Sequence, residues 1–252
     1  MKNALPTDFA VRTCAAPRQP GTLSAIPLAE TGVDVWIAPV VGSEPTDAWE
    51  EFLTPEERDR ARRFRFKEDF RRFVYGRGLL RELLASYLGV RATEVQFVYS
   101  EEGKPGLAPD KATLPVSFNV SHSGTYILVG FARNRRIGVD VEQMRRDIEV
   151  EQIAKRFFSD AEQQALVSLD QASRIPAFFR CWTRKEAFVK ATGVGLSLPL
   201  HQFDVSLLPG EAATLLATRP EPLEAQRWTL RNIELDADYA AAVAVERYST
   251  AT

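Results

Sequence analysis

Cysteine and histidine are scarce in this sequence of 252 residues, which contains two of each. Cys14 and Cys181 lie far apart without metal-type spacing, and a single pair cannot form a disulfide framework. With only His122 and His201 available, a histidine-based zinc site is not expected. The low cysteine content favours a reducing compartment, so we expect the protein in the cytoplasm.

Long apolar runs and a charge excess are also lacking. No run of about 19 apolar residues could span a membrane, and the first 20 residues have no apolar segment of a secretory signal, so no membrane partner is expected. The net charge of −2 gives no general attraction for nucleic acid. No glycine fingerprint of a nucleotide-binding loop is present. The composition predicts a soluble globular protein.

The chain divides into a tail and two similar halves. Residues 1–20 contain three prolines and predict a loose N-terminal tail. Residues 21–134 and 135–252 each predict a long helix with mainly antiparallel strands, separated by a turn at residues 134–136. This order favours an α+β fold of two lobes over a doubly wound sheet.

Several local signals place the helices and strands. Thr54 and Glu57 form a predicted capping box for a helix ending near Phe64, and Gly89 ends a longer helix from about Lys67. In the second half, Ser159 with Glu162 begins one helix, and another is expected at about 176–191. Strands are predicted near residues 33–38, 94–99, 117–120, 126–132, 137–142, 202–207, 227–234 and 240–247.

Two acidic residues mark the most informative strand, Ile137–Glu142. Because side chains alternate along a strand, Asp140 and Glu142 share one face, with Gly138 leaving room there for a ligand. Two like charges side by side repel unless a cation lies between them, and Mg²⁺ prefers oxygen ligands. The alternative from spacing alone is a solvated edge strand with two surface acids.

The helix at 176–191 interrupts its own apolar face with charge. Lys185 falls within a stripe that contains Trp182 and Phe188, while Glu186 lies at its edge and Lys190 one turn further. Such breaks of a local pattern concentrate at functional sites. The alternative is a lysine with its charged end in solvent and a surface pair between Glu186 and Lys190.

A polar turn and a basic helix offer anion contacts. Ser121, His122 and Ser123 precede Gly124 at a strand end, where hydroxyls and exposed backbone can bind phosphate. A structural histidine is the alternative. The basic segment, Thr54–Arg77, contains mostly arginine with interleaved acids. Lys104 lies in a Gly-Lys-Pro turn, where it could reach an anion or simply cap a hairpin.

Together these segments resemble the 4′-phosphopantetheinyl transferases of the larger single-chain, surfactin-synthetase-activating type. The ordered set across about 50–210 is highly specific for that family, although each motif alone is weak. The matching stretches are Phe64–Asp69, Gly103–Pro105, Phe118–Ser123, Ile137–Glu142, Lys155–Ser159, Trp182–Lys190 and Gly193–Pro199.

The resemblance implies two lobes related by pseudo-twofold symmetry, with coenzyme A in the cleft between them. Residues 21–134 would hold its 3′-phosphoadenosine side and residues 135–252 the catalytic acids. Carried over by position, Asp140, Glu142 and Glu186 would bind Mg²⁺, with Mn²⁺ as the alternative. Glu186 is also the candidate general base, Lys190 would contact phosphate, and Lys185 would support the same catalytic group. Of the contacts with coenzyme A, Ser121 and His122 would both meet the 3′-phosphoadenosine end, and Lys104, Lys67, Arg63 or Arg72 would add positive charge there.

The implied reaction transfers 4′-phosphopantetheine from coenzyme A to a serine of an apo acyl or peptidyl carrier protein and releases 3′,5′-ADP. Such carriers serve fatty-acid, polyketide or non-ribosomal peptide synthases. The carrier would bind transiently, with Gly193–Leu198 and the Phe157–Phe158 region as candidate contacts. The enzyme is expected to be a monomer because one chain completes the cleft.

Three other classes stay open from the residues. A catalytically silent carrier-binding relative would keep the fold without turnover. A nucleic-acid binder would use the basic helix, against the net charge and the interleaved acids. A magnesium-dependent phosphoesterase would use water in place of serine as the acceptor.

Overall fold

The computed structural model describes residues 10–13, 20–28, 32–40, 42, 45–100, 105–108, 114–219 and 221–248. The first part of the chain forms β1 (Ala10–Thr13), β2 (Val33–Pro39), α1 (Thr46–Glu50), α2 (Pro55–Arg62), α3 (Lys67–Leu88), β3 (Phe97–Tyr99), β4 (Pro105–Leu107), β5 (Val116–Ser123) and β6 (Tyr126–Arg133). The second part forms β7 (Ile137–Gln143), α4 (Val150–Phe157), α5 (Asp160–Val167), α6 (Gln171–Thr192), β8 (Phe203–Val205), β9 (Leu215–Thr218), β10 (Trp228–Asn232) and β11 (Tyr239–Glu246).

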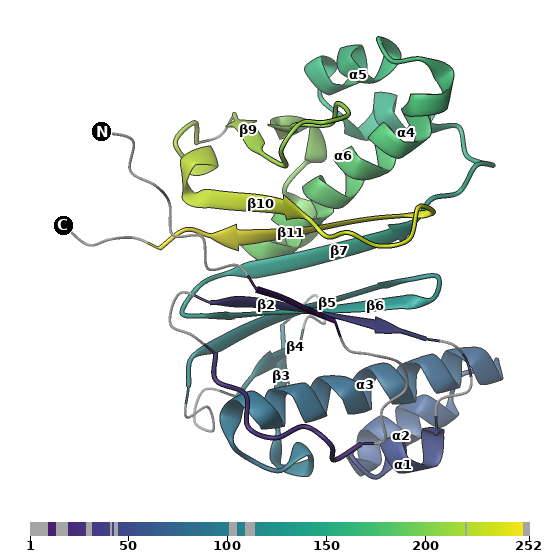
Figure 1. The fold of residues 1–252 in the computed structure, drawn as a ribbon, viewed down its shortest axis with the longest axis vertical. Helices are drawn as coiled ribbons and strands as arrows, with labels where there is room; N and C mark the ends of the chain where they lie inside the picture. Colours follow the sequence, from purple (N-terminus) through teal and green to yellow (C-terminus); the bar gives the residue numbers. More distant parts are fainter. Residues whose placement is uncertain are drawn as a thin grey trace.

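Two long helices enclose two sheets. The layers run from α3 through the sheet β1-β2-β6-β5 and the sheet β10-β11-β7 to α6 (Figure 1). Among the described strands, all pairs are antiparallel except β1 with β2. The α+β class predicted from the order of elements is therefore confirmed.

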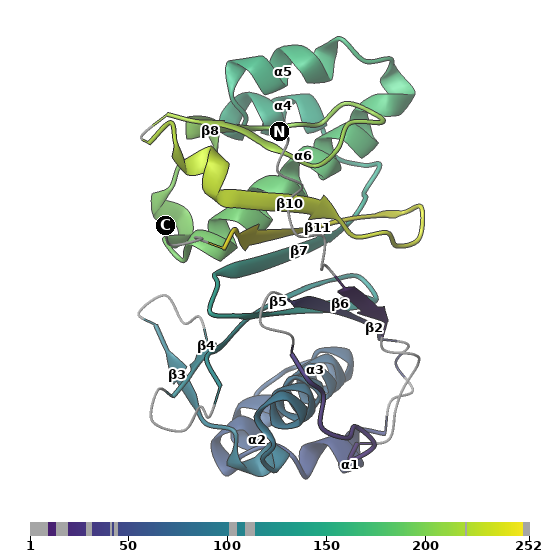
Figure 2. The same cartoon turned by 60° about the vertical axis from the view of Figure 1, so that its left-hand side comes forward.

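Each pair of neighbouring layers is held by an apolar core. Leu83 and Phe131 belong to the core between α3 and its sheet, and Phe188 and Ala242 to the core under α6. A third core, which includes Val139, packs the faces of the two sheets against each other. The two sheets lie face to face between the helices in the turned view as well (Figure 2). None of the described helices is long and apolar enough to cross a membrane.

The predicted helix ends are largely confirmed. Thr54 and Ser159 each accept a bond from the backbone N–H three residues later, and both capping boxes are complete. Gly89 takes the left-handed conformation, with φ of 69°, at the end of α3. The start of α6 was predicted wrongly at Pro176. Proline removes only one backbone bond there, and the helix continues back to its cap at Asp170.

Other elements differ from the expectation. The short helices α1 and α4 were not predicted. Ala10–Thr13, within the segment expected to be a loose tail, pairs in parallel with β2. The remaining tail residues, 1–9 and 14–19, lie outside the described residues.

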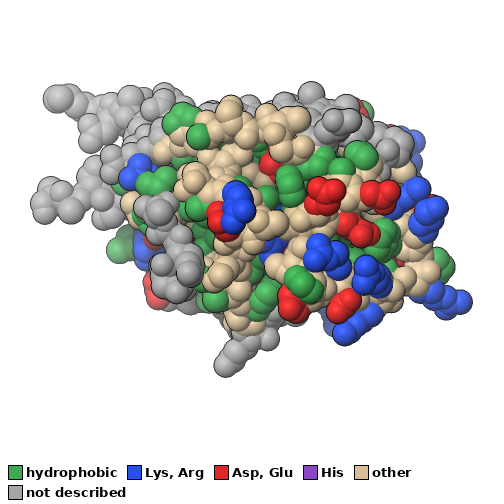
Figure 3. Space-filling view, turned by 90° about the horizontal axis from the view of Figure 1, so that it is seen from below, with side chains coloured by type: hydrophobic (Ala, Val, Ile, Leu, Met, Phe, Trp, Pro, Cys, Tyr) green, Lys and Arg blue, Asp and Glu red, His purple; other side chains and the backbone are tan. Residues whose placement is uncertain are grey.

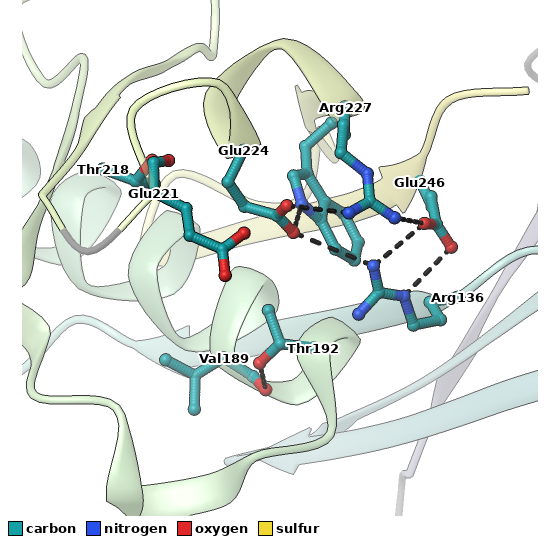
Figure 4. Close-up of polar contacts among 9 residues, drawn as sticks. Arg136, Val189, Thr192, Thr218, Glu221, Glu224, Arg227 and Glu246 are labelled. Atoms are coloured by element: carbon teal, nitrogen blue, oxygen red, sulfur yellow. Dashed lines mark hydrogen bonds and ion pairs between the residues drawn. The ribbon is translucent and has the colours of Figure 1, made fainter. Parts of the chain in front are cut away.

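The predicted turn at residues 134–136 joins the two sheets. Asn134 has a positive φ of 53°, and Arg136 lies directly before β7. Arg136 donates to Glu246 on β11 at 2.9 and 3.0 Å, and Arg227 also binds Glu246 (Figure 4). The bond from Arg136 is the main reason why the pKa of Glu246 falls to about 2. This ion-pair network ties the turn to the second sheet.

Gly138 has a different role from the one predicted. A Cβ atom there would lie 2.1 Å from the carbonyl oxygen of Ala187 and 2.4 Å from the backbone nitrogen of Ala191. The space beside Gly138 is therefore filled by the backbone of α6, and no ligand can use it. The close approach brings α6 onto the face of β7 that carries the acids.

Gly138→Ala should therefore destabilise the protein, because the new methyl group would push α6 away from β7. We expect the free energy of unfolding to fall by about 3 kcal/mol, measured by urea denaturation. Gly106→Ala, where the nearest atom to the new Cβ is 3.7 Å away, is the matched control and should change it by less than about 0.5 kcal/mol. Equal stability of both variants would contradict this packing.

Candidate functional site

The site forms where the edges of the two sheets meet. β5 ends the first sheet and β7 ends the second, so among the described strands each has one edge without a backbone partner. Buried N–H groups need acceptors, and side chains of β5 provide them. Asn119 Oδ1 accepts from Val139 N at 2.9 Å, Ser121 Oγ from Val141 N at 3.3 Å, and Ser123 Oγ from Gln143 N at 3.0 Å. We call these three side chains the β5 ladder.

Asp140 lies beside the middle of this ladder and is nearly inaccessible, with 2% of its surface exposed. The surface-acid alternative is therefore wrong for this residue. Its Oδ1 accepts bonds from Lys190 Nζ at 2.6 Å and from Ser121 Oγ at 3.0 Å. Burial raises the pKa of Asp140 to about 6, against the opposing charge of Lys190.

Glu142 and Glu186 complete an acidic group on facing elements. Glu142 follows Asp140 on the same face of β7, and Glu186 comes from α6, which packs on that face. Burial raises the pKa of both carboxyl groups. The negative charge of one other acid also raises the pKa of each: Glu142 acts on Asp140, Glu186 on Glu142, and Asp140 on Glu186. Mutual repulsion of this kind favours a bound cation.

The acids fit a hard cation by donor chemistry. Within the described ranges, no three Asp, Glu, His or Cys side chains form a ready-made metal site. However, Asp140 Oδ2 is buried and has no hydrogen-bond partner in the part of the chain that the structure describes, which leaves one carboxylate oxygen to fill. Buried polar atoms without partners are uncommon and costly. Carboxylate oxygens are the ligands that Mg²⁺ and Mn²⁺ prefer.

The two lysines of α6 bind different groups. Lys190 reaches the acids, where it bonds both Asp140 and Ser121, and its charge also acts to lower the pKa of Glu186. The alternative of a pair between Glu186 and Lys190 alone on the surface is therefore wrong. Lys185 is fully buried and turned to the other side, where Nζ lies 2.8 Å from Glu162 and donates to the carbonyl oxygens of Leu200 and Phe203. Its charge in the apolar stripe is explained by this buried ion pair, which ties α6 to α5 and to the segment before β8.

Ser121 and His122, predicted to meet the same end of coenzyme A, lie on opposite faces of β5. Ser121 is buried against Asp140, and His122 lies at the edge of a cavity of about 300 Å³ below the first sheet. Partial burial, followed by the charges of Arg72 and Lys190, lowers the pKa of His122. Strand alternation enforces this separation.

That cavity combines cations with aromatic rings. It is lined by Arg60, Arg72 and Arg77 and by Phe64 and Phe73, among other residues. Such a lining suits a planar ring that carries phosphate. Arg60 and Arg77 were not among the site residues expected from the sequence. The helical spacing of positions 69, 72, 73, 76 and 80, which share one face of α3, is a signal that could have pointed to this cavity.

Two of the other predicted phosphate contacts lie outside this cavity. Arg63 and Lys67 are exposed and do not line it. Lys104 lies outside the described residues. The exposed face of α2 and α3 mixes both signs of charge (Figure 3). Arg62 pairs with Asp59, and Arg72 pairs with Asp69. This mixture disfavours the nucleic-acid alternative.

Comparison with known proteins identifies the class. Residues 136–244 match the family model described as 4′-phosphopantetheinyl transferase superfamily. Residues 44–133 match the model described as 4′-phosphopantetheinyl transferase, N-terminal.

Individual relatives of this chain carry the same family description. The 4′-phosphopantetheinyl transferase HetI of Nostoc sp. is 41% identical over 77% of this chain and 78% of its own length. The 4′-phosphopantetheinyl transferase Sfp of Bacillus subtilis is 35% identical over 81% and 86%, respectively. A holo-(acyl-carrier-protein) synthase of Bacillus anthracis, solved in complex with CoA, covers 45% of this chain and 96% of its own, with 18% identity and a TM-score of 0.37. Since that structural likeness is weak, the assignment rests on the sequence relatives.

The chain therefore belongs to the 4′-phosphopantetheinyl transferase superfamily, as its motifs predicted, and to the type represented by Sfp. It is an enzyme that transfers phosphopantetheine.

Lys190→Met should destabilise the protein at pH 7.5 because it removes the ammonium group that pairs with the buried carboxylate of Asp140. We expect a loss of about 2 kcal/mol in the free energy of unfolding, measured by denaturant titration in EDTA. The double variant Lys190→Met/Asp140→Asn should recover most of that loss, since no charge is left buried. Equal losses in the single and double variants would show that the pair contributes nothing.

Proposed function

We propose that this enzyme transfers the 4′-phosphopantetheine group of coenzyme A to a serine hydroxyl of an apo carrier protein, with Mg²⁺ bound by Asp140, Glu142 and Glu186. The observation that carries the proposal is the acidic group at the β5–β7 contact, with a bare buried oxygen on Asp140 and a lysine beside it. The carrier would be an acyl or peptidyl carrier of a fatty-acid, polyketide or peptide synthase.

The two sides of β5 suggest how coenzyme A lies. The cavity with His122 and Arg72 suits the 3′-phosphoadenosine end, and the acids with Lys190 suit the pyrophosphate. The cavity and the acidic group both lie against β5, where the neighbouring residues 121 and 122 point to opposite faces. This arrangement would stretch the substrate across the strand and keep the phosphate to be transferred beside Lys190.

The reaction follows from charge and proton positions. The serine oxygen forms a bond to the phosphorus on the pantetheine side as the bond to the pyrophosphate bridging oxygen breaks, and 3′,5′-ADP leaves. Bound Mg²⁺ would neutralise charge on the pyrophosphate. Lys190 would stabilise the transferred phosphoryl group, so positioning and electrostatics supply most of the rate. Glu186, which faces the strand acids from α6, would accept the serine proton directly or through a water.

The same proposal covers the shape of the molecule. We propose two lobes related by pseudo-twofold symmetry, residues 21–134 and 135–252. In support, each half packs one 22-residue helix on a sheet, and both helices end at a left-handed glycine, Gly89 and Gly193. A monomer in the cytoplasm stays a prediction.

The direct test is intact mass spectrometry of apo carrier proteins incubated with the enzyme, coenzyme A and Mg²⁺. A phosphopantetheine mass gain on the carrier is expected, and it should disappear with EDTA and with Asp140→Ala. His122→Ala is the matched control: it keeps the acids and should reach full modification, but at about tenfold higher coenzyme A, as one lost charged contact of about 1.4 kcal/mol implies. No gain on any carrier class would favour a silent relative, and coenzyme A cleavage without a carrier would favour a phosphoesterase.

Glu186→Gln tests the proton acceptor separately. The amide cannot take a proton but keeps an oxygen for the cation, so we expect the turnover number to fall about 100-fold, with Mn²⁺ binding retained. Single-turnover rates at saturating coenzyme A measure this. Near-normal turnover with the metal still bound would assign Glu186 to cation binding only.

A further inference from the structure

We propose that Ser123 is a positioning residue that fixes Glu142 for cation binding, and that Ser121 acts in the same way on Asp140. This inference rests on the proposed function of the acidic group. It assigns a second task to the β5 ladder, which otherwise only closes the edge of β7.

The hydroxyl of Ser123 has its hydrogen-bonding directions fixed. Its oxygen accepts from Gln143 N at 3.0 Å, and it donates to Glu142 Oε2 at 3.0 Å. A hydroxyl has one hydrogen, so the bond to the backbone fixes where Oγ lies, and the single hydrogen goes to the carboxylate. Glu142 is thereby held through one oxygen by a side chain that the backbone of its own strand anchors.

Ser121, two residues before Ser123 on β5, has the same geometry. Its oxygen accepts from Val141 N at 3.3 Å and donates to Asp140 Oδ1 at 3.0 Å. It also accepts from Lys190 Nζ at 3.0 Å. Oδ1 is therefore occupied by two donors while Oδ2 stays bare. The serine thus selects which oxygen of Asp140 is left for a cation.

The third member of the ladder shows that serine is not needed for closing the edge. Asn119 binds Val139 N at 2.9 Å through its amide oxygen. The residue before Val139 is Gly138, which has no side chain to orient. The two members beside acids are serines, which accept and donate through one atom, whereas the member beside glycine is an asparagine.

Hydrogen bonds of this kind matter to metal sites. Partners that orient a ligand typically change metal affinity or activity by 10–100-fold when they are removed. Ser123 is a cleaner subject than Ser121, because Ser121 also contacts Lys190 and its loss would disturb two charges at once.

The experiment compares Ser123→Ala, Ser123→Thr and Asn119→Ala with the wild-type enzyme. Electron paramagnetic resonance measures Mn²⁺ binding, the transfer assay gives the Mg²⁺ concentration for half-maximal rate, and thermal unfolding in EDTA reports on the fold. Ser123→Ala should weaken Mn²⁺ binding and raise the Mg²⁺ requirement by about tenfold. Ser123→Thr keeps the hydroxyl and should stay within about twofold of the wild type.

Asn119→Ala is the matched control. It removes one side-chain oxygen of the same ladder, which accepts from a backbone N–H and touches no acid. We therefore expect a lower melting temperature and an unchanged Mn²⁺ affinity. The proposal is overturned if Ser123→Ala binds Mn²⁺ as tightly as the wild type, or if Asn119→Ala weakens binding equally, because the ladder would then act only through the fold.

The outcomes separate this inference from the proposed function. Wild-type enzyme that modifies carriers with Mg²⁺, together with an unchanged Mn²⁺ affinity in Ser123→Ala, overturns the positioning role alone. Wild-type enzyme that needs no divalent cation overturns both.

Discussion

The contact between the free edges of β5 and β7 is the constraint on which the site depends. The backbone N–H groups of β7 must find acceptors, because an unpaired buried donor costs about 1–3 kcal/mol. Side chains of β5 meet this need, and they bring the hydroxyls of Ser121 and Ser123 beside Asp140 and Glu142. The same bonds thus join the two sheets and line the acidic group.

A second constraint comes from α6. Its backbone lies so close to β7 that only glycine fits at position 138, and this approach brings Glu186 and Lys190 over the two strand acids. Three carboxyl groups with raised pKa values then share a partly buried space with one lysine. Such a group has a surplus of negative charge that a divalent cation would neutralise, as the proposed function requires.

Much of this could be predicted from local sequence. Capping boxes at Thr54 and Ser159 act within four residues, and the alternation at Ile137–Glu142 depends only on strand geometry, so both were confirmed. The partner of Lys185 could not be predicted, because Glu162 lies 23 positions earlier and meets it only after α5 packs on α6. The separation of Ser121 from His122 was available from alternation, but the resemblance placed both on one end of coenzyme A.

We propose that the β5–β7 contact and α6 together form one cation site. Anomalous X-ray scattering from crystals grown with Mn²⁺ and coenzyme A would locate the cation. We expect a manganese peak bonded to Asp140 Oδ2 and to carboxylate oxygens of Glu142 and Glu186, with the pyrophosphate beside Lys190. A peak at any other group of side chains, with Lys190 still on Asp140 and no metal at Oδ2, would contradict it.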